Sequence, residues 1–340
     1  MMEERLRIND KIKTAMMLAV VLYHSCMFFT GTWFDKAQPI YKAGYLVFFA
    51  KYLNTFHVQT FVMAAGFLFY ALRKEKNKYR NNLESDALKR AKRLLLPYVC
   101  TIAFWVLPFY IVYSEFDISK IMYKYVLGCA PSQLWFLPML FWIFIVYYVT
   151  FAKYKPNKSG LIINALISIG GGYVLNKLGC INFLQLVTAV QYGMFYYLGA
   201  YLYENETKLT IKKTVLCSIL SISGYVLSLM LSNEDTIILK MIALLANNIG
   251  SFSSILVVYG IANILSSENG NSKLWNTLKK NSFGIYLFHQ QLIYPCIMLL
   301  NGRVTPCMQV LISFIIAICG ASIITEILRK IKITEMFFGV

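Results

Sequence analysis

The chain has few charged residues, and most of its charge is of one sign. Only 14% of the 340 residues are charged, whereas about a quarter of the residues are charged in an average soluble domain. Aspartate and glutamate together number 16, and nearly all of them lie outside the long apolar stretches. We therefore do not expect the relay of buried carboxylates that is typical of ion-coupled pumps.

Sequence motifs of soluble catalytic and metal sites are also missing. The chain has no Gly-rich phosphate loop, no HExxH and no GxSxG pattern. Its eight cysteines form no CxxC pair, and most lie within apolar stretches. We interpret these cysteines as small buried apolar residues, and we expect neither a disulfide framework nor a metal site.

Long apolar stretches dominate the sequence, which is 58% hydrophobic and has a mean hydropathy of +0.56. A helix needs roughly 20 mostly apolar residues to cross a bilayer. The sequence therefore predicts an all-α, polytopic membrane helix bundle of about ten transmembrane helices, with one membrane domain covering residues 1–340. The second and eighth spans are long enough to be tilted or broken. The predicted spans are Ile12–Thr30, Gly44–Leu72, Leu94–Tyr113, Leu134–Ala152, Leu161–Leu178, Leu184–Tyr203, Ile211–Leu231, Ile237–Leu265, Ser282–Leu300 and Pro306–Leu328.

The basic residues indicate how these spans are oriented. If the N-terminus is cytoplasmic, 25 of the 33 lysines and arginines fall at cytoplasmic ends and loops, and seven fall outside. This asymmetry predicts that both termini are in the cytoplasm. It also explains the net charge of +17, so we expect membrane lipids and no nucleic acid as partners. The first span lacks a small-x-small cleavage site, and we expect it to be retained.

A cation and a histidine lie on one face of the first predicted span. Lys13 and His24 are eleven positions apart, which on a helix is about 20° past three full turns and a rise of about 16 Å. This places a positive charge at the inner surface and an imidazole near the middle of the bilayer. The arrangement suits a long substrate with an anionic head and a reactive far end. Alternatively, His24 bonds a neighbouring helix, and Lys13 only extends to the surface.

Two further spans carry polar residues where lipid would be unfavourable. The second span holds Asn54 and His57, and we expect His57 to lie at a depth similar to that of His24. The alternative is a structural polar seam between helices. In the ninth span, Ser282, Tyr286 and His289 follow an i, i+4, i+7 pattern and share a face.

The start of the ninth span and the basic loop before the third are both candidate phosphate sites. Ser282 or Asn281 is predicted to cap the ninth helix, whose free N–H groups would then face a phosphate. The alternative is a capped helix with an ordinary Tyr–His packing pair. The loop from Arg73 to Arg93 is the densest basic stretch. Topology and contact with anionic lipids explain most of it, but one or two of its residues suit the phosphates of a cofactor.

Six short segments, in order along nearly the whole chain, form a recognisable set. The first consists of Arg7, Asp10, Lys13 and His24, and the others are Phe61–Leu68, Arg90–Tyr98, Leu134–Leu137, Phe195–Gly199 and Ser282–His289. Together these segments resemble the acyltransferase-3 superfamily of bacterial integral membrane acyltransferases. Lys13 stands where the family usually has arginine, and Ala65 stands where serine is usual. A lysine keeps the charge of an arginine but not its two-pronged phosphate geometry.

The resemblance implies a multi-pass protein of a bacterial inner membrane. Such a protein moves an acyl group, typically acetyl, from cytoplasmic acetyl-CoA or another acyl-CoA to a hydroxyl of a glycan or lipid-linked sugar. His24 is then expected to be the general base. Tyr286 or His289 would stabilise the oxyanion or orient the acyl carbonyl, and Lys13, Arg90 and Arg93 would hold the phosphates of CoA. The residues expected to contact substrate are His57, Asn54, Trp135 and Ser282.

Two other interpretations fit the same sequence. A transporter or flippase of a glycan lipid or acyl donor would also be polytopic with a wet interior. Transport would be favoured by an inverted repeat of the spans, and none is visible. A family member that has lost activity is the other interpretation, because of the two departures at Lys13 and Ala65.

Overall fold

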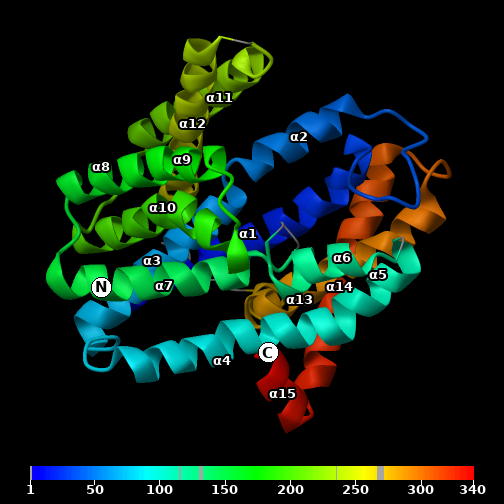
Figure 1. Ribbon diagram of the computed structural model, residues 1–340, viewed down its shortest axis with the longest axis horizontal. Coiled ribbons are helices and arrows are strands. Elements are labelled where there is room, and N and C mark those ends of the chain that lie inside the picture. Colours follow the sequence, from blue (N-terminus) through cyan, green and yellow to red (C-terminus); the bar gives the residue numbers. More distant parts are fainter. Residues whose placement is uncertain (1, 115, 130–132, 235, 266–271) are drawn as a thin grey trace.

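The computed structural model describes residues 2–114, 116–129, 133–234, 236–265 and 272–340, and within these ranges it contains helices, turns and loops but no strand (Figure 1). The prediction of an all-α bundle is confirmed. The helices are α1 Met2–Met27, α2 Gly44–Asn54, α3 His57–Lys76, α4 Leu83–Thr101, α5 Leu107–Tyr113, α6 Ile118–Ile121, α7 Phe136–Lys153, α8 Lys158–Leu166, α9 Gly172–Lys177, α10 Leu186–Glu204, α11 Ile211–Leu231, α12 Ile237–Ile264, α13 Lys273–Leu300, α14 Pro306–Arg329 and α15 Lys332–Phe338.

Nine helical segments in the described part of the chain are long and apolar enough to cross a membrane. They correspond to nine of the ten predicted spans. The remaining span, predicted at Leu184–Tyr203, is the 19-residue helix α10, which is rich in tyrosine. This helix packs against α3, α7 and α8 and is mostly buried. Its surface therefore meets other helices rather than lipid, which explains why it is less apolar than the rest.

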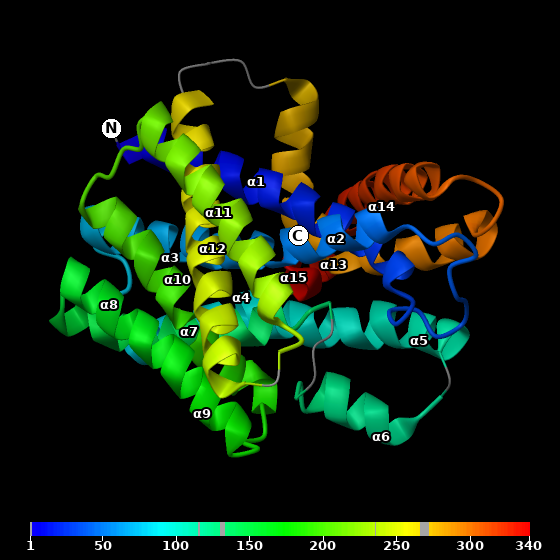
Figure 2. The same ribbon diagram turned by 90° about the horizontal axis from the view of Figure 1, so that it is seen from above.

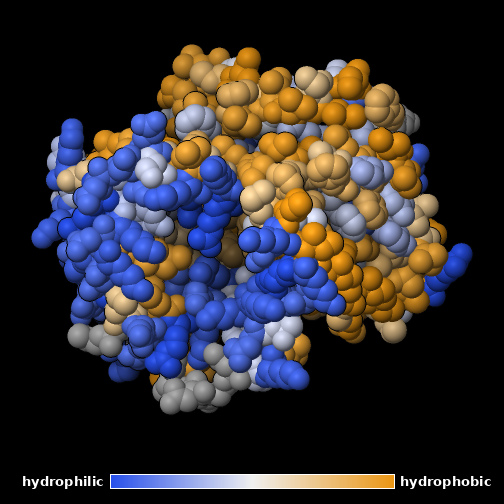
Figure 3. All heavy atoms as spheres, turned by 90° about the horizontal axis from the view of Figure 1, so that it is seen from below, coloured by the Kyte–Doolittle hydropathy of each residue, from blue (hydrophilic) through white to orange (hydrophobic). Residues whose placement is uncertain are grey.

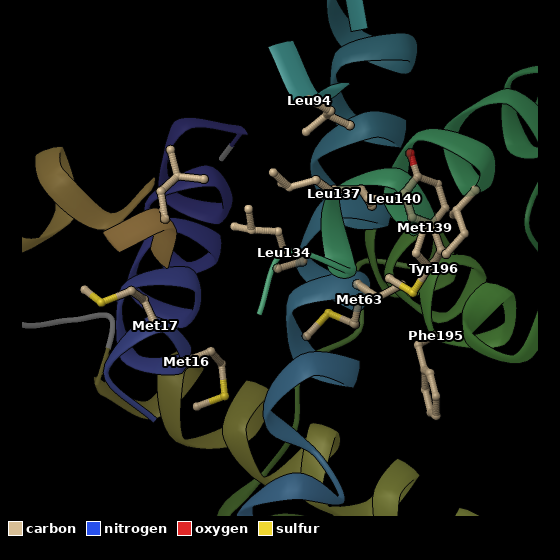
Figure 4. Packing of buried hydrophobic residues seen from close by; sticks show 14 of the residues in the cluster. Met16, Met17, Met63, Leu94, Leu134, Leu137, Met139, Leu140, Phe195 and Tyr196 are labelled. Carbon is tan, nitrogen blue, oxygen red and sulfur yellow. The ribbon is translucent and has the colours of Figure 1, made fainter. Parts of the chain in front are cut away.

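Helix α1 lies in the middle of the bundle and contacts α2, α3, α12, α13 and α14 (Figure 2). Its buried side chains belong to a continuous apolar core that also includes residues of α3, α7 and α10. Figure 4 shows this packing, with Met16 and Met17 on α1, Met63 on α3 and Tyr196 on α10. A functional group on α1 is consequently held by helices on several sides.

Two glycines let α3 and α10 cross at very close range. A side chain at Gly66 would collide with the backbone carbonyl of Tyr196, and one at Gly199 would collide with the backbone of Met63 and Phe67. Both glycines belong to the short segments on which the family resemblance rests. These segments therefore include the contact at which the two helices touch backbone to backbone, as is typical of small residues in membrane helices.

The second predicted span is broken, and the break lies at Thr55 and Phe56 between α2 and α3. Backbone carbonyls freed by the break need partners inside a membrane. The Thr55 hydroxyl donates to the Tyr52 carbonyl at 2.8 Å, and the Gln59 amide donates to the Asn54 carbonyl at 3.3 Å. The polar residues of this span thus stabilise the break, and they place His57 at the first position of α3.

The eighth span is one continuous helix, α12, so of the two alternatives, tilted or broken, the break is excluded. The expectation about the start of the ninth helix was wrong. The ninth helix, α13, begins at Lys273, where the Ser272 side chain caps it by accepting from the Trp275 N–H. Ser282 and Asn281 therefore lie inside this helix and cap nothing. Hydropathy marks where a helix becomes apolar, whereas α13 begins about two turns earlier, in a polar stretch of sequence. The N-terminus of α13 is therefore not at Ser282, and no free N–H groups are available at Ser282 to bind a phosphate.

The surface divides into a polar and an apolar part. Figure 3 shows hydrophilic residues gathered on one side of the lower face, with apolar residues covering the other side and a hollow where the two meet. Large apolar side chains are exposed along α11, α12 and α14. This division is expected for helices that face lipid with polar segments outside it.

The close crossing of α3 and α10 predicts the effect of adding one methyl group. Gly199→Ala is expected to destabilise the fold by about 2 kcal/mol or more, because the new group meets backbone that cannot move aside. Gly170→Ala is the matched control, because a side chain there meets open space and alanine favours a helix over glycine. Thermal unfolding of both variants in detergent checks this. A Gly199→Ala protein as stable as the wild type would contradict the account of the crossing.

Candidate functional site

A cavity of about 610 Å³ passes between α1, α3, α4, α7 and α13. It brings together residues from five of the six segments that the sequence singled out, all except Phe195–Gly199. Nine of the ten residues proposed from the sequence as site residues line it, and the tenth, His289, does not. The nine are Lys13, His24, Asn54, His57, Arg90, Arg93, Trp135, Ser282 and Tyr286.

His24 and His289 form a direct hydrogen bond between α1 and α13. The His24 Nδ1 and His289 Nε2 atoms are 2.9 Å apart, and the ring centroids are 5.0 Å apart. His289 Nδ1 lies 2.9 Å from the backbone carbonyls of Ile285 and Tyr286. Because a carbonyl only accepts, His289 Nδ1 carries the proton. Its Nε2 is then the acceptor in the neutral ring, and His24 Nδ1 is the donor.

This chain of hydrogen bonds fixes the tautomer of His24. With the proton on Nδ1, the neutral His24 ring carries its lone pair on Nε2. His24 lines the cavity, whereas His289 is fully buried behind it. The sequence led us to expect that His289 contacts substrate. Both of its ring nitrogens already have protein partners, so its position fits a residue that orients His24.

His57 lies close to the same pair, as its mid-span position predicted. The Tyr23 ring centroid is 5.0 Å from the His24 ring and 4.8 Å from the His57 ring. His57 Nδ1 donates to the Leu53 carbonyl at 2.6 Å across the break between α2 and α3. By the same argument, the lone pair of the neutral His57 ring is on Nε2. His24 and His57 both line the cavity, and in each neutral ring Nε2 is the hydrogen-bond acceptor.

Tyr286 lines the cavity, but its hydroxyl proton is already used. The hydroxyl donates to the Gln133 carbonyl at 2.9 Å. Gln133 and Gln291 bond each other reciprocally through their amides, at 2.8 and 2.6 Å. An oxyanion needs a free donor, so the position of Tyr286 suits the shaping of the cavity wall better than the oxyanion role that we expected from the sequence.

Arg90 is a half-buried cation without an ionic partner among the described residues. Its Nε is buried and makes no hydrogen bond, and its guanidinium lies 5.2 Å over the Phe144 ring. Neither Arg90 nor the exposed Arg93 takes part in any ion pair of the described residues. A buried charge is costly unless it is paired. This end of the cavity is therefore suited to an anionic ligand.

Lys13 also lines the cavity, but its positive charge is already neutralised by a carboxylate. Its ammonium is 2.7 Å from the Asp10 carboxylate, which is also 2.8 Å from Lys279 on α13. Asp10 thus joins α1 to α13 and holds Lys13 in place. Arg90 is the stronger candidate for direct anion binding, because no carboxylate of the described residues satisfies it.

Some residues of the cavity lining are exposed, among them Arg93 on α4, Thr32 just after α1, and Asn54 at the end of α2. Lys13 and His24 follow one face of α1 and both line the cavity, as their spacing predicted. Along the chain, His24 therefore lies between Lys13 and the exposed Thr32.

Several cavity residues were missed by the sequence reasoning. Gln290, Gln291 and Tyr294 follow His289 directly on α13, and their polarity inside an apolar span was an available signal. Trp33 and Lys124 lie outside the predicted spans, where no periodicity marks them. Among the described residues, no group of three or more His, Cys, Asp or Glu side chains is placed to hold a metal ion.

Comparison with family profiles gives one result that covers most of the chain. The acyltransferase domain family known as acyltransferase-3 matches residues 10–326. Comparisons with curated proteins and with solved structures give no match. The matched range includes every residue of the site described above. With its apolar helices, the protein is thus a multi-pass integral membrane protein, and the chain belongs to the acyltransferase-3 family of acyltransferases.

Proposed function

We propose that the protein transfers an acyl group, typically acetyl, from cytoplasmic acyl-CoA to a hydroxyl of a glycan or lipid-linked sugar. The proposal places it in a bacterial-type inner membrane with both termini in the cytoplasm. One observation carries the proposal. His24, with its lone pair directed by His289, lines a cavity whose lining also holds a half-buried arginine with an unpaired buried Nε and several exposed polar residues.

The positive charges in the cavity suggest where the acyl donor binds. The phosphates of CoA are the anions that Arg90, Arg93 and Lys13 would neutralise, and a guanidinium binds phosphate through charge-assisted hydrogen bonds. On α1, Lys13 and His24 are separated by a rise of about 16 Å, so an extended arm is needed between the phosphates and the reacting group. An acyl-CoA has this form, with its thioester at the end of the arm.

The transfer itself needs one base and no redox partner. His24 Nε2 takes the proton of the acceptor hydroxyl as its oxygen attacks the thioester carbonyl. The tetrahedral intermediate then expels the CoA sulfur, which receives the proton from His24. The His24 imidazolium that forms between these steps is stabilised by its Nδ1–H bond to His289. His57, Asn54, Trp135 and Ser282 line the cavity beside it and are proposed to contact the substrates.

A transporter or flippase of a glycan lipid or acyl donor is the alternative, and a cavity with polar residues inside the bundle suits it as well. The two functions differ in the covalent product. Purified protein incubated with labelled acetyl-CoA and a hydroxyl acceptor would yield labelled ester only if it is an acyltransferase.

Removing the proposed base should abolish the reaction but not the fold. His24→Ala is expected to lower the rate of acyl transfer by about 10²-fold to 10⁴-fold, the usual contribution of a general base. The measurement is transfer of labelled acetyl in membranes, together with thermal unfolding of the purified variant. Full transfer by a folded His24→Ala protein would remove His24 from the mechanism.

Replacing His289 tests whether it orients His24 or merely fills space. His289→Leu removes the acceptor for His24 Nδ1–H and should lower kcat by about 10-fold to 100-fold, the value of a hydrogen bond to a charged group. His289→Gln keeps an acceptor oxygen and should recover part of this loss at equal thermal stability. Equal activity of the two variants would show that packing, and not the hydrogen bond, is what matters.

The unpaired arginine predicts a loss in donor affinity. Arg90→Met should raise the KM for acetyl-CoA by about 10-fold or more, because a charge-assisted bond to phosphate is lost. The KM for acetyl-pantetheine, which has no phosphates, should not change. Lys92→Met is the matched control, since Lys92 is exposed on the same helix and does not line the cavity. Equal effects of both variants on KM would contradict a specific phosphate contact.

A further inference from the structure

The end of the cavity at Trp33 and Tyr294 carries features that acyl transfer alone does not require. Three aromatic rings cluster there. The Trp33 ring centroid is 6.1 Å from that of His24 and 5.3 Å from that of Tyr294, and Tyr294 stacks on Phe34 at 5.2 Å. Trp33 and Tyr294 both line the cavity. Flat apolar faces beside the base suit a ligand whose body is a ring.

A buried polar atom in this part of the cavity lacks a partner. The Gln290 amide nitrogen donates to the Tyr294 hydroxyl at 2.8 Å, while its Oε1 is buried and accepts no hydrogen bond. A buried acceptor left unpaired is unfavourable unless a ligand or water donates to it. Gln290 lines the cavity, so a hydroxyl of a bound molecule is a suitable donor.

Lys124 adds a positive charge to the same end. It is partly buried, lines the cavity, and has its ammonium 5.6 Å from the centre of the Tyr125 ring. Burial lowers the pKa of Lys124, and the carboxylate of Asp35 acts in the opposite direction. Asp35 is exposed and makes no ion pair with Lys124 among the described residues. A bound anion would favour the charged form of this lysine.

Lys120, a nearby lysine, has different surroundings from Lys124. Lys120 lies one turn earlier in the chain, is exposed, and pairs with Asp117 at 3.7 Å. It does not line the cavity. Lys124 therefore differs from Lys120 in lining the cavity and in having no direct ion pair among the described residues.

We infer that this end of the cavity binds an acidic acceptor, a sugar that carries a carboxylate or a phosphate close to the hydroxyl that is acylated. Lys124 neutralises the acidic group, the rings of Trp33 and Tyr294 cover the face of the sugar, and Gln290 accepts from one of its hydroxyls. This inference rests on the proposed function for the reaction, while the recognition of the anion rests on Lys124 alone.

Three methyl glycosides test it as acceptors and as ligands: methyl β-glucoside, the glucuronide with a carboxylate at C6, and the glucoside 6-phosphate. The two acidic probes are expected to show a kcat/KM about 10-fold to 100-fold above that of the neutral one, as a hydrogen bond to a charged group predicts. Comparing the carboxylate with the phosphate identifies which acidic group is preferred. Binding of each probe is measured separately by tryptophan fluorescence of the purified protein.

Substitutions of Lys124 and Lys120 test which positive charge causes the preference for acidic acceptors. Lys124→Met should remove the preference for the acidic probes over the neutral one, and Lys124→Arg should keep the preference. Lys120→Met removes one positive charge from the same segment outside the cavity and should change nothing. A wild type that binds all three probes equally, or a Lys120→Met effect equal to that of Lys124→Met, would overturn the inference.

The two readouts separate this inference from the reaction. Acyl transfer to all three probes without a charge preference contradicts only the acidic acceptor site. Preferential binding of the acidic probes without any transfer supports the anion site and contradicts the proposed acyl transfer.

Discussion

The hydrogen bond between His24 and His289 is the contact on which the site depends. It joins α1 to α13, and the backbone carbonyls of α13 determine which nitrogen of each ring carries the proton. An imidazole alone on an apolar helix could rotate or change tautomer. Here the helix backbone, one fully buried histidine and the cavity-lining histidine form a single chain of donors and acceptors, so the lone pair of His24 is set before any substrate binds.

The bilayer is the reason why so few polar residues define the site. Every polar group inside the bundle needs a partner, so unpaired ones are informative. Arg90 lacks an anion near one end of the cavity, and the Oε1 of Gln290 lacks a donor in its interior. At the break between α2 and α3, by contrast, the polar groups have partners, because Thr55 and Gln59 donate hydrogen bonds to the carbonyls that the break exposes. The break is thus a stable feature that positions His57.

The sequence predicted the all-α architecture and the shared face of Lys13 and His24, because hydropathy and the 100° step of a helix decide both. It did not predict the role of His289. An i, i+4, i+7 pattern gives the direction of Ser282, Tyr286 and His289 around their helix but not what each one meets. His289 bonds His24 on α1, whereas the Tyr286 hydroxyl bonds the Gln133 carbonyl. Lys124 and Trp33 lie in connecting segments, where only the folded chain shows that they line the cavity.

The family resemblance and the physical reasoning contribute different parts. The resemblance selected the segments containing Gly66 and Gly199 without saying why glycine is needed, and the structure shows that the backbones of α3 and α10 meet there. It also pointed to Lys13, which proves to be paired with Asp10, while Arg90 is left unpaired. The charge of a side chain can be read from sequence, but whether that charge is already satisfied depends on its neighbours.

The function that we propose has one central claim: His24 transfers an acyl group from acyl-CoA at the cytoplasmic face to an acceptor that enters the same cavity from the other face of the membrane. Sealed vesicles containing the protein in one orientation test it, with labelled acetyl-CoA present only on the cytoplasmic face and a sugar acceptor only on the other. The account predicts labelled acceptor outside while CoA remains on the cytoplasmic face. Transfer that occurs only when both substrates share a face would contradict it.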